Sequence, residues 1–181
     1  MTKMDKPPPS CPPLPFRLLV MADTHGRLTE ARKAILEQGP WDFIVHLGDS
    51  LLDAVDLAVE LGVDVVGVRG NNEYAHAPGF EEELVFELGG VRFYAVHGHK
   101  LDLNPWSQEF EAGLAELARR ARRAKAEVGL FAHTHVPLVR ELSGVLLVNP
   151  GALGHGDKKK TYAQIEVEGP GKVKAWIKEI N

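Results

Sequence analysis

The first half of the chain alternates short apolar runs with segments of helical periodicity. Three apolar runs lack helical spacing and are typical of buried strands. The expected elements are strands at residues 16–22, 43–47 and 63–68 and helices at residues 28–38 and 51–61. Gly39-Pro40 stops the first helix, Gly62 follows the second, and Ser50 is placed to cap the second. This order predicts parallel strands joined by right-handed crossovers.

The second half of the chain is richer in strands. They are expected at residues 84–88, 91–96, 127–131, 137–141, 145–149, 161–167 and 172–178. A Gly-Gly pair at residues 89–90 predicts a hairpin between the first two. Asn104-Pro105 is expected to open a long helix, with the asparagine as its cap. The apolar stripe of this helix includes Leu114 and Leu117. The fold class is therefore α/β, with mixed or antiparallel strands added in the second half.

Composition and charge narrow the class of protein. A length of 181 residues predicts one domain, which we place at residues 16–181. Residues 1–15 hold six of the twelve prolines, which is typical of an extended or mobile tail. The single cysteine, Cys11, excludes an internal disulfide and a cysteine-based metal site. A net charge of −4 argues against a broad surface for duplex nucleic acid.

The apolar segments also bear on location. The proline-rich start has no apolar core of the kind found in secretory signals, and no run is long enough to cross a bilayer. We therefore expect a cytoplasmic protein without a membrane partner.

Polar residues of one chemical kind follow nearly every expected strand. They form the series Asp23-Thr24-His25, Gly48-Asp49, Gly70-Asn71, His97-Gly98-His99 and His133-Thr134-His135. In open α/β sheets, ligands collect outside the carboxyl ends of the strands, so five loops are expected to converge on one crevice. Residues two apart in extended backbone point the same way, which lets the pairs Asp23/His25 and His133/His135 each aim two donors at one place.

The donor types indicate metal chemistry. Carboxylates, imidazoles and an amide without thiolate suit manganese, iron, cobalt, nickel or zinc. Two carboxylates (Asp23 and Asp49), one amide and at least four imidazoles are too many for one ion. They suit two ions that share a bridging carboxylate, roughly 3.5–4 Å apart, which bind phosphoryl oxygens and acidify a water.

Each motif has a plainer reading when it stands alone. An aspartate such as Asp49 is often a turn residue or a helix cap, and Gly70-Asn71 is often a loop that needs positive φ. Closely paired histidines are uncommon without a metal or a proton to transfer. The ordered series of all five motifs favours the metal site.

The series, together with Asn149-Pro150-Gly151, resembles the calcineurin-like metallophosphoesterase superfamily, and most of all its small phosphodiesterases of the YfcE and MJ0936 type. The resemblance runs from Phe16 to the end of the chain. It implies a four-layer α/β/β/α sandwich of two mixed β-sheets flanked by helices, with a dinuclear metal site at its edge.

The resemblance also implies a role for each residue. Asp23, His25, Asp49 and His135 correspond to the ligands of the first ion, and Asn71, His97 and His133 complete the second, with Asp49 bridging. Manganese is the first expectation for both ions, with iron, nickel, cobalt and zinc as alternatives. A bridging hydroxide is expected to attack phosphorus in line. Asn71 and His99 are the candidate catalytic residues, with His99 near the phosphate.

One position departs from the family pattern. Many members read Gly-Asn-His, with that histidine protonating the leaving group, whereas this chain has Asn72, which cannot act as an acid. We therefore expect modest turnover and leaving groups that need little protonation, unless His99 or His76 serves instead. A smaller departure is Ala132, where glycine is usual before His-Thr-His.

Three functions stay open at this point. The leading hypothesis is a phosphodiesterase that acts on small or activated phosphate esters. The alternatives are a phosphomonoesterase or nucleotidase, and a non-catalytic binding scaffold like the retromer subunit Vps29. A nuclease fits the net charge of −4 poorly. Whether the protein forms a homo-oligomer is left open. Loops at residues 73–80, 99–106 and 152–160 are expected to set the substrate.

Three further features receive plainer interpretations. His46, inside an expected strand, is interpreted as a core residue. Trp41, Trp106 and Trp176 are assigned to packing or an interface. The run at Lys158-Lys159-Lys160 and the nearby His155 are expected in a solvated loop.

Overall fold

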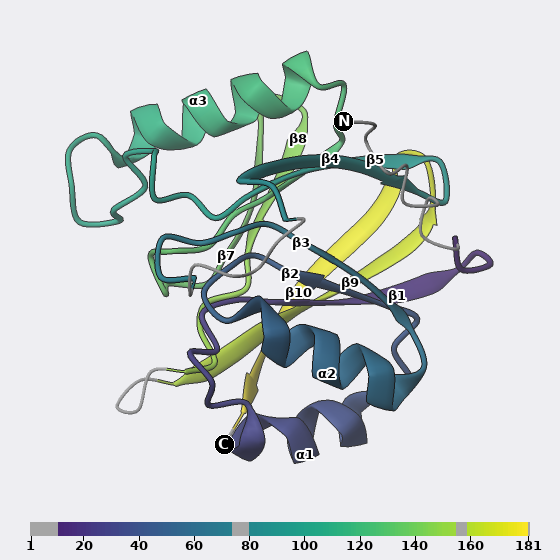
Figure 1. Ribbon diagram of the computed structural model, residues 1–181. Coiled ribbons are helices and arrows are strands. Elements are labelled where there is room, and N and C mark those ends of the chain that lie inside the picture. The colour runs from purple at the N-terminus through teal and green to yellow at the C-terminus, as the bar shows by residue number, and fades with distance from the viewer. Residues whose placement is uncertain (1–10, 74–79, 155–158, 181) are drawn as a thin grey trace, which may run out of the picture.

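The computed structural model describes residues 11–73, 80–154 and 159–180 as two stacked β-sheets with helices outside them (Figure 1). The first sheet has the strand order β10 (Lys172–Ile180), β9 (Lys160–Gly169), β1 (Phe16–Met21), β2 (Phe43–His46) and β3 (Asp64–Gly67). The second has the order β4 (Glu83–Leu88), β5 (Val91–Val96), β6 (Val128–Leu130), β8 (Val145–Asn149) and β7 (Leu138–Leu142). The helices are α1 (Thr29–Gln38), α2 (Leu51–Leu61) and α3 (Phe110–Arg123).

Both sheets are mixed. Strands β1, β2 and β3 are parallel, as the alternation of strands and helices predicts, and β9 and β10 extend that sheet antiparallel. In the second sheet β5, β6 and β8 are parallel, while β4 and β7 pair antiparallel at its edges. The hairpin predicted at residues 89–90 joins β4 to β5, and both glycines have positive φ.

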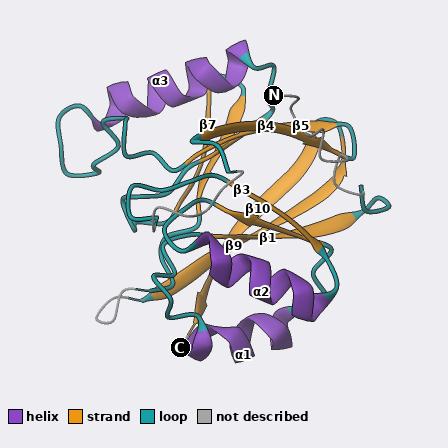
Figure 2. Ribbon diagram, viewed as in Figure 1, coloured by secondary structure: helices purple, strands orange, loops and turns teal. Residues whose placement is uncertain are grey.

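Three apolar layers hold the sandwich together. Phe43, Val45, Phe93 and Leu130 belong to the buried cluster between the two sheets. A second cluster packs α1 and α2 on the outer face of the first sheet, and a third packs α3 on the outer face of the second. Figure 2 shows the resulting order of layers, with α3 on one side and α1 and α2 on the other. The expected four-layer α/β/β/α sandwich is confirmed.

Two local predictions about helix starts were wrong. Ser50 makes no side-chain cap and lies in the left-handed region with φ 80°. The carboxylate of Glu73 instead accepts the Leu51 N–H, with N–O distances of 3.2 and 3.3 Å. Asn104 caps only a turn: its Oδ1 accepts the Trp106 N–H at 3.0 Å, and helix α3 begins six residues later, at Phe110.

The described end of the proline-rich segment lies against the β4–β5 hairpin, where the Gly89 N–H is 3.0 Å from Cys11 Sγ. Trp41 is packed in the core, whereas Trp106 is exposed. No helix in the described ranges is long and apolar enough to cross a membrane.

Candidate metal centre

The predicted ligands meet where the parallel strands of both sheets end. Backbone hydrogen bonds beyond the strands tie these loops together: the Asp23 N–H donates to Gly48 O at 3.0 Å, and the Ala132 N–H donates to His97 O at 2.8 Å. The seven predicted ligands and His99 are linked by a continuous series of contacts between their side chains. The structure thus brings all eight residues together, as the sequence predicts.

Five of these side chains stand on strained backbone. Asp23, His25, Asp49, His133 and His135 all have φ between 49° and 67°. This left-handed region is uncommon for residues other than glycine and costs conformational energy. Such a concentration at one edge indicates that the loops are shaped to aim these side chains inward at the expense of local stability.

Asp23 is a fully buried carboxylate at the centre of one group. Its Oδ1 lies 3.1 Å from His135 Nε2 and 3.9 Å from His25 Nε2. Among the described residues, neither oxygen of Asp23 receives a hydrogen bond of good geometry. A buried carboxylate without donors is costly unless a cation meets it. The three side chains could hold one metal ion.

Asp49 lies between this group and the next. Its Oδ2 is 3.9 Å from His25 Nε2 and 3.7 Å from His97 Nε2. Burial alone would raise the pKa of Asp49, but hydrogen bonds from the side chain and backbone of Asn72 outweigh it, so the pKa lies below its usual value. The carboxyl is therefore ionised at neutral pH and faces imidazoles on both sides.

His97 faces the same space. Its Nδ1 lies 2.6 Å from the Leu47 carbonyl, which can only accept, so Nδ1 carries a proton. Nε2 is then the ring nitrogen that could bind a metal ion, and it lies 3.0 Å from Asn71 Oδ1 and 3.7 Å from Asp49 Oδ2. Asp23, Asp49 and His97 form the second group that could hold an ion.

His133 and His99 border this second group. The ring of His133 is centred 5.2 Å from that of His97, and the ring of His99 lies 5.5 Å from His97. Burial is the main cause that lowers the pKa of each, and His97 adds to it, so both favour the neutral form. His99 Nδ1 has no hydrogen-bond partner in the described part of the chain. A neutral imidazole at the border of this group can contact a bound phosphate through its N–H.

A second layer of polar residues supports the ligand loops. His46 Nδ1 accepts the Gly48 N–H at 3.1 Å, and its Nε2 faces Thr24 Oγ1 at 3.3 Å. The Thr24 hydroxyl donates to Ser50 O at 3.2 Å. Burial lowers the pKa of His46 to about 3, so the ring is neutral. His46 is a core residue, as predicted, and it also connects the Asp23 and Asp49 loops.

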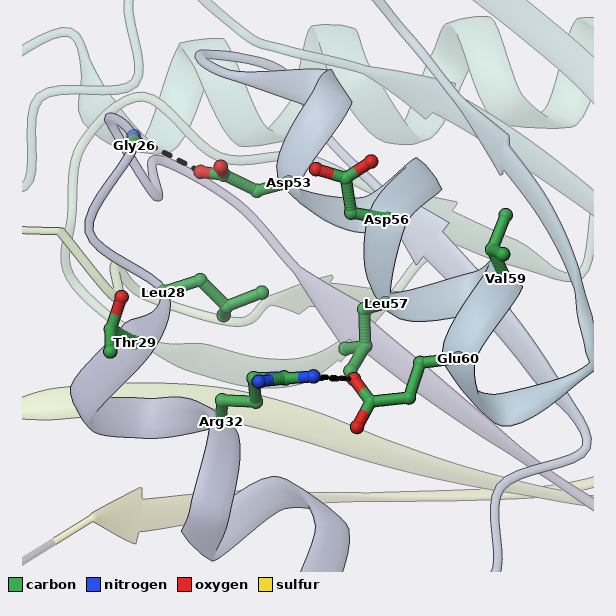
Figure 3. Close-up of a pocket in the computed structure, with 9 residues that line it drawn as sticks. All are labelled: Gly26, Leu28, Thr29, Arg32, Asp53, Asp56, Leu57, Val59 and Glu60. Atoms are coloured by element: carbon green, nitrogen blue, oxygen red, sulfur yellow. Dashed lines mark hydrogen bonds and ion pairs between the residues drawn. The ribbon is translucent and has the colours of Figure 1, made fainter.

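Asp53 of α2 supports the loop that carries His25. Its carboxylate accepts the Gly26 N–H at 3.0 Å, as the dashed line in Figure 3 shows. The cavity in this view, about 410 Å³, lies between α1 and α2. Arg32 pairs with Glu60 at its wall, so that cation is already neutralised. This cavity is distinct from the cluster of histidines.

Sequence reasoning missed the roles of Asn72, Thr24 and Asp53. The residue types alone carry no signal for these contacts, because each depends on which loop faces which. His76, the alternative acid suggested by the sequence, and His155, expected in a solvated loop, lie outside the described residues.

The fold and the site together define a metal-dependent phosphoric ester hydrolase: an α/β/β/α sandwich that gathers carboxylates, imidazoles and an amide at its strand ends. The chain belongs to the calcineurin-like phosphoesterase superfamily, whose domain matches residues 16–169. The family expected from the sequence is confirmed.

Individual relatives agree with this assignment. The chain is 29% identical over 157 residues to the probable metallophosphoesterase YsnB of Bacillus subtilis, covering 84% of this chain and 85% of that protein. It is 24% identical over 179 residues to phosphodiesterase MJ0936 of Methanocaldococcus jannaschii, covering 84% of this chain and 100% of that protein.

Solved structures show the same architecture. A predicted phosphoesterase from Streptococcus pneumoniae matches with a TM-score of 0.63 and 27% identity, covering 91% of this chain and 98% of that one. The zinc complex of Vps29 from Entamoeba histolytica matches with a TM-score of 0.68 and 20% identity, covering 91% and 99%. The second likeness concerns the fold alone.

Proposed function

We propose that this protein is a dinuclear-metal-dependent phosphodiesterase that hydrolyses small or activated phosphate diesters. The observation that carries the proposal is the pair of overlapping ligand groups, Asp23-His25-His135 and Asp23-Asp49-His97. Within each group the ligand atoms lie within 4.8 Å of one another. The two groups share Asp23, and Asp49 of the second group also faces His25 of the first. Two adjacent positions for a cation with carboxylates between them favour two ions over one.

The ligands divide between the ions by position. Asp23, His25, Asp49 and His135 are assigned to the first ion, and Asp49, Asn71, His97 and His133 to the second. Asp49 Oδ2 supports the bridging role because it faces His25 at 3.9 Å and His97 at 3.7 Å. The donor set without thiolate suits manganese, with iron, cobalt, nickel or zinc as alternatives.

When bound, the two ions supply charge neutralisation at the phosphoryl oxygens and an acidified water for in-line attack on phosphorus. The chain contributes the geometry. The Leu47 carbonyl fixes the His97 ring so that Nε2 faces the site, and Asn72 fixes the plane of the Asp49 carboxylate. His99 is assigned to contact the phosphate.

The residue at position 72 favours esters with an activated leaving group. Asn72 has no proton to transfer, and its side-chain N–H is already donated to Asp49 Oδ2 at 2.9 Å. Leaving groups that are stable as anions need no acid, so activated esters suit the site. The choice of a diester is supported by the relative named phosphodiesterase MJ0936.

The test uses metal-stripped protein with bis(4-nitrophenyl) phosphate and 4-nitrophenyl phosphate, with and without Mn²⁺. We expect manganese-dependent cleavage that is faster for the diester, and loss of that cleavage in Asp49→Ala. Asp56→Ala is the matched control, because Asp56 is an exposed carboxylate of α2 outside the site.

Two outcomes would overturn parts of the proposal. A preference for the monoester would make the protein a phosphomonoesterase. No turnover by the folded protein with Mn²⁺, Fe²⁺, Co²⁺, Ni²⁺ or Zn²⁺ would make it a binding scaffold.

A further inference from the structure

A cavity of about 470 Å³ adjoins the candidate metal centre on the side of the second sheet. Its lining comes from the segment between β5 and α3, at residues 101–107 and 109, and from His133 and Thr134 after β6. That segment extends as a wide loop beyond the N-terminal end of α3 (Figure 1). His133 is assigned to the second ion, so the cavity opens directly beside the position of the reacting phosphate.

The loop has a defined backbone. Leu103 is buried in the cluster under α3, and the Asp102 carbonyl packs so closely on Gly113 that a Cβ there would lie 2.0 Å from its oxygen. The Ser107 N–H donates to Asn104 O at 3.0 Å. These contacts anchor the backbone of the loop beside the cavity.

Trp106 is the unusual side chain of this loop. It lines the cavity and is 76% exposed, although an indole is among the largest apolar groups a protein can bury. Ser107 Oγ, in the same wall, is buried and has no hydrogen-bond partner among the described residues. The open aromatic face of Trp106 is suited to a flat ligand that stacks on it.

The charge of the lining restricts the ligand further. Asp102 and Glu109 contribute carboxylates, and the lining holds no lysine or arginine. A second phosphate or a carboxylate on the ligand would therefore be repelled. Exocyclic amino groups, by contrast, would find acceptors there.

We propose that this cavity is a subsite for one ester group of the diester substrate, and that it takes a planar, uncharged aryl or nucleobase group stacked on Trp106. The proposal rests on the proposed function, because it places the phosphate at His133. It adds the substrate class: diesters with an aromatic or nucleoside substituent are preferred over purely aliphatic ones.

The kinetic test compares two diesters that share one leaving group, 4-nitrophenyl phenyl phosphate and 4-nitrophenyl ethyl phosphate. We expect kcat/KM to be about tenfold higher for the phenyl ester, which is the size of one stacking contact. Trp106→Ala should remove most of this preference, and Trp106→Phe should retain part of it. Trp176→Ala, at a half-exposed position on β10, is the matched control and should leave the preference unchanged.

A second measurement does not depend on turnover. The three tryptophans give three indole N–H signals in a ¹⁵N spectrum, and Trp106→Phe identifies that of Trp106. Adenosine should shift this signal, whereas ribose should not. A shift without turnover of either diester would support the subsite and contradict the proposed function. The subsite alone would be overturned by two results together. Both diesters are cleaved with a ratio of kcat/KM values that Trp106→Ala does not change, and adenosine does not shift the indole signal of Trp106.

Discussion

Asn72 holds both oxygens of the Asp49 carboxylate. Its backbone N–H donates to Oδ1 at 2.8 Å, and its Nδ2 donates to Oδ2 at 2.9 Å. The residue that cannot serve as an acid thus orients the carboxylate assigned to bridge the two ions. Partners of metal ligands typically change affinity 10- to 100-fold when removed.

Asn72→Ala should therefore weaken Mn²⁺ binding by about 10- to 100-fold, while the fold persists because the backbone bond to Oδ1 remains. Calorimetric titration of metal-free protein measures this directly. Gln108→Ala removes an exposed amide outside the site and serves as control. Equal affinities of Asn72→Ala and the parent protein would show that Asp49 needs no such support.

Asp23 illustrates a conflict between stability and function. Its buried carboxylate receives no hydrogen bond of good geometry from the described residues, and its φ of 52° suits asparagine at least as well. Asp23→Asn removes a buried charge and should stabilise the metal-free protein by about 1–3 kcal/mol. The same change should abolish stabilisation by Mn²⁺, because a carboxylate ligand is lost.

Thermal unfolding with chelator and with Mn²⁺ separates the two effects. For a chain of this size, 1 kcal/mol shifts the Tm by about 2–4 °C. The parent protein should gain stability on adding Mn²⁺, and Asp23→Asn should not. A variant that is less stable than the parent in chelator would mean that Asp23 already has a compensating partner in the metal-free state.

Gly70 leaves room for the Asp49 carboxylate. A Cβ at position 70 would lie 2.1 Å from Asp49 Oδ1, and the backbone N of Asp49 would be 2.6 Å away. Gly70→Ala should therefore displace the carboxylate, cost about 1–3 kcal/mol of stability and reduce metal affinity. Chemical denaturation and metal titration together measure both effects.

Gly39→Ala is the matched control for this substitution. At Gly39 the nearest atom to an added Cβ is 3.4 Å away, and φ is −60°, so neither a clash nor backbone strain arises. If Gly70→Ala and Gly39→Ala behaved alike, the close packing of Gly70 on Asp49 would have no consequence for the site.

The elements were predictable because their signals are local. The apolar runs at residues 16–22 and 43–47 lie within a residue of β1 and β2, and Gly62 ends α2 in the left-handed conformation. The edge where the ligands meet was also predictable, because parallel strands place their carboxyl ends together.

Contacts between distant loops were not predictable. Ser50 has the residue type of a cap, yet Glu73 fills that role because the loop after β3 folds back over α2. Likewise, nothing in Asn104-Pro105 distinguishes a helix start from the isolated turn observed there. Which of two chemically suitable residues is used depends on tertiary packing, and that information is spread over the whole chain.

His46 should make the protein sensitive to acid. The neutral ring accepts the Gly48 N–H at Nδ1, so a second proton would place two N–H groups face to face in a buried site. Burial lowers the pKa of His46 from 6.5 to about 3 in the folded state. Between these values the unfolded chain binds a proton that the folded chain does not.

The stability that His46 contributes is therefore complete above pH 6.5 and is lost as the pH falls toward 3. The loss amounts to about 1.4 kcal/mol per pH unit. The His46→Gln variant has no ionisable group at this position. As the pH falls, its free energy of unfolding should therefore decrease less steeply than that of the parent protein, by about 1.4 kcal/mol per pH unit. Urea unfolding in chelator at pH 5, 6, 7 and 8 measures the difference between the two proteins. The other histidines are present in both, so their contributions cancel. Parallel curves would contradict the prediction, as would a His46 ring signal that titrates near pH 6.5 in the folded parent protein.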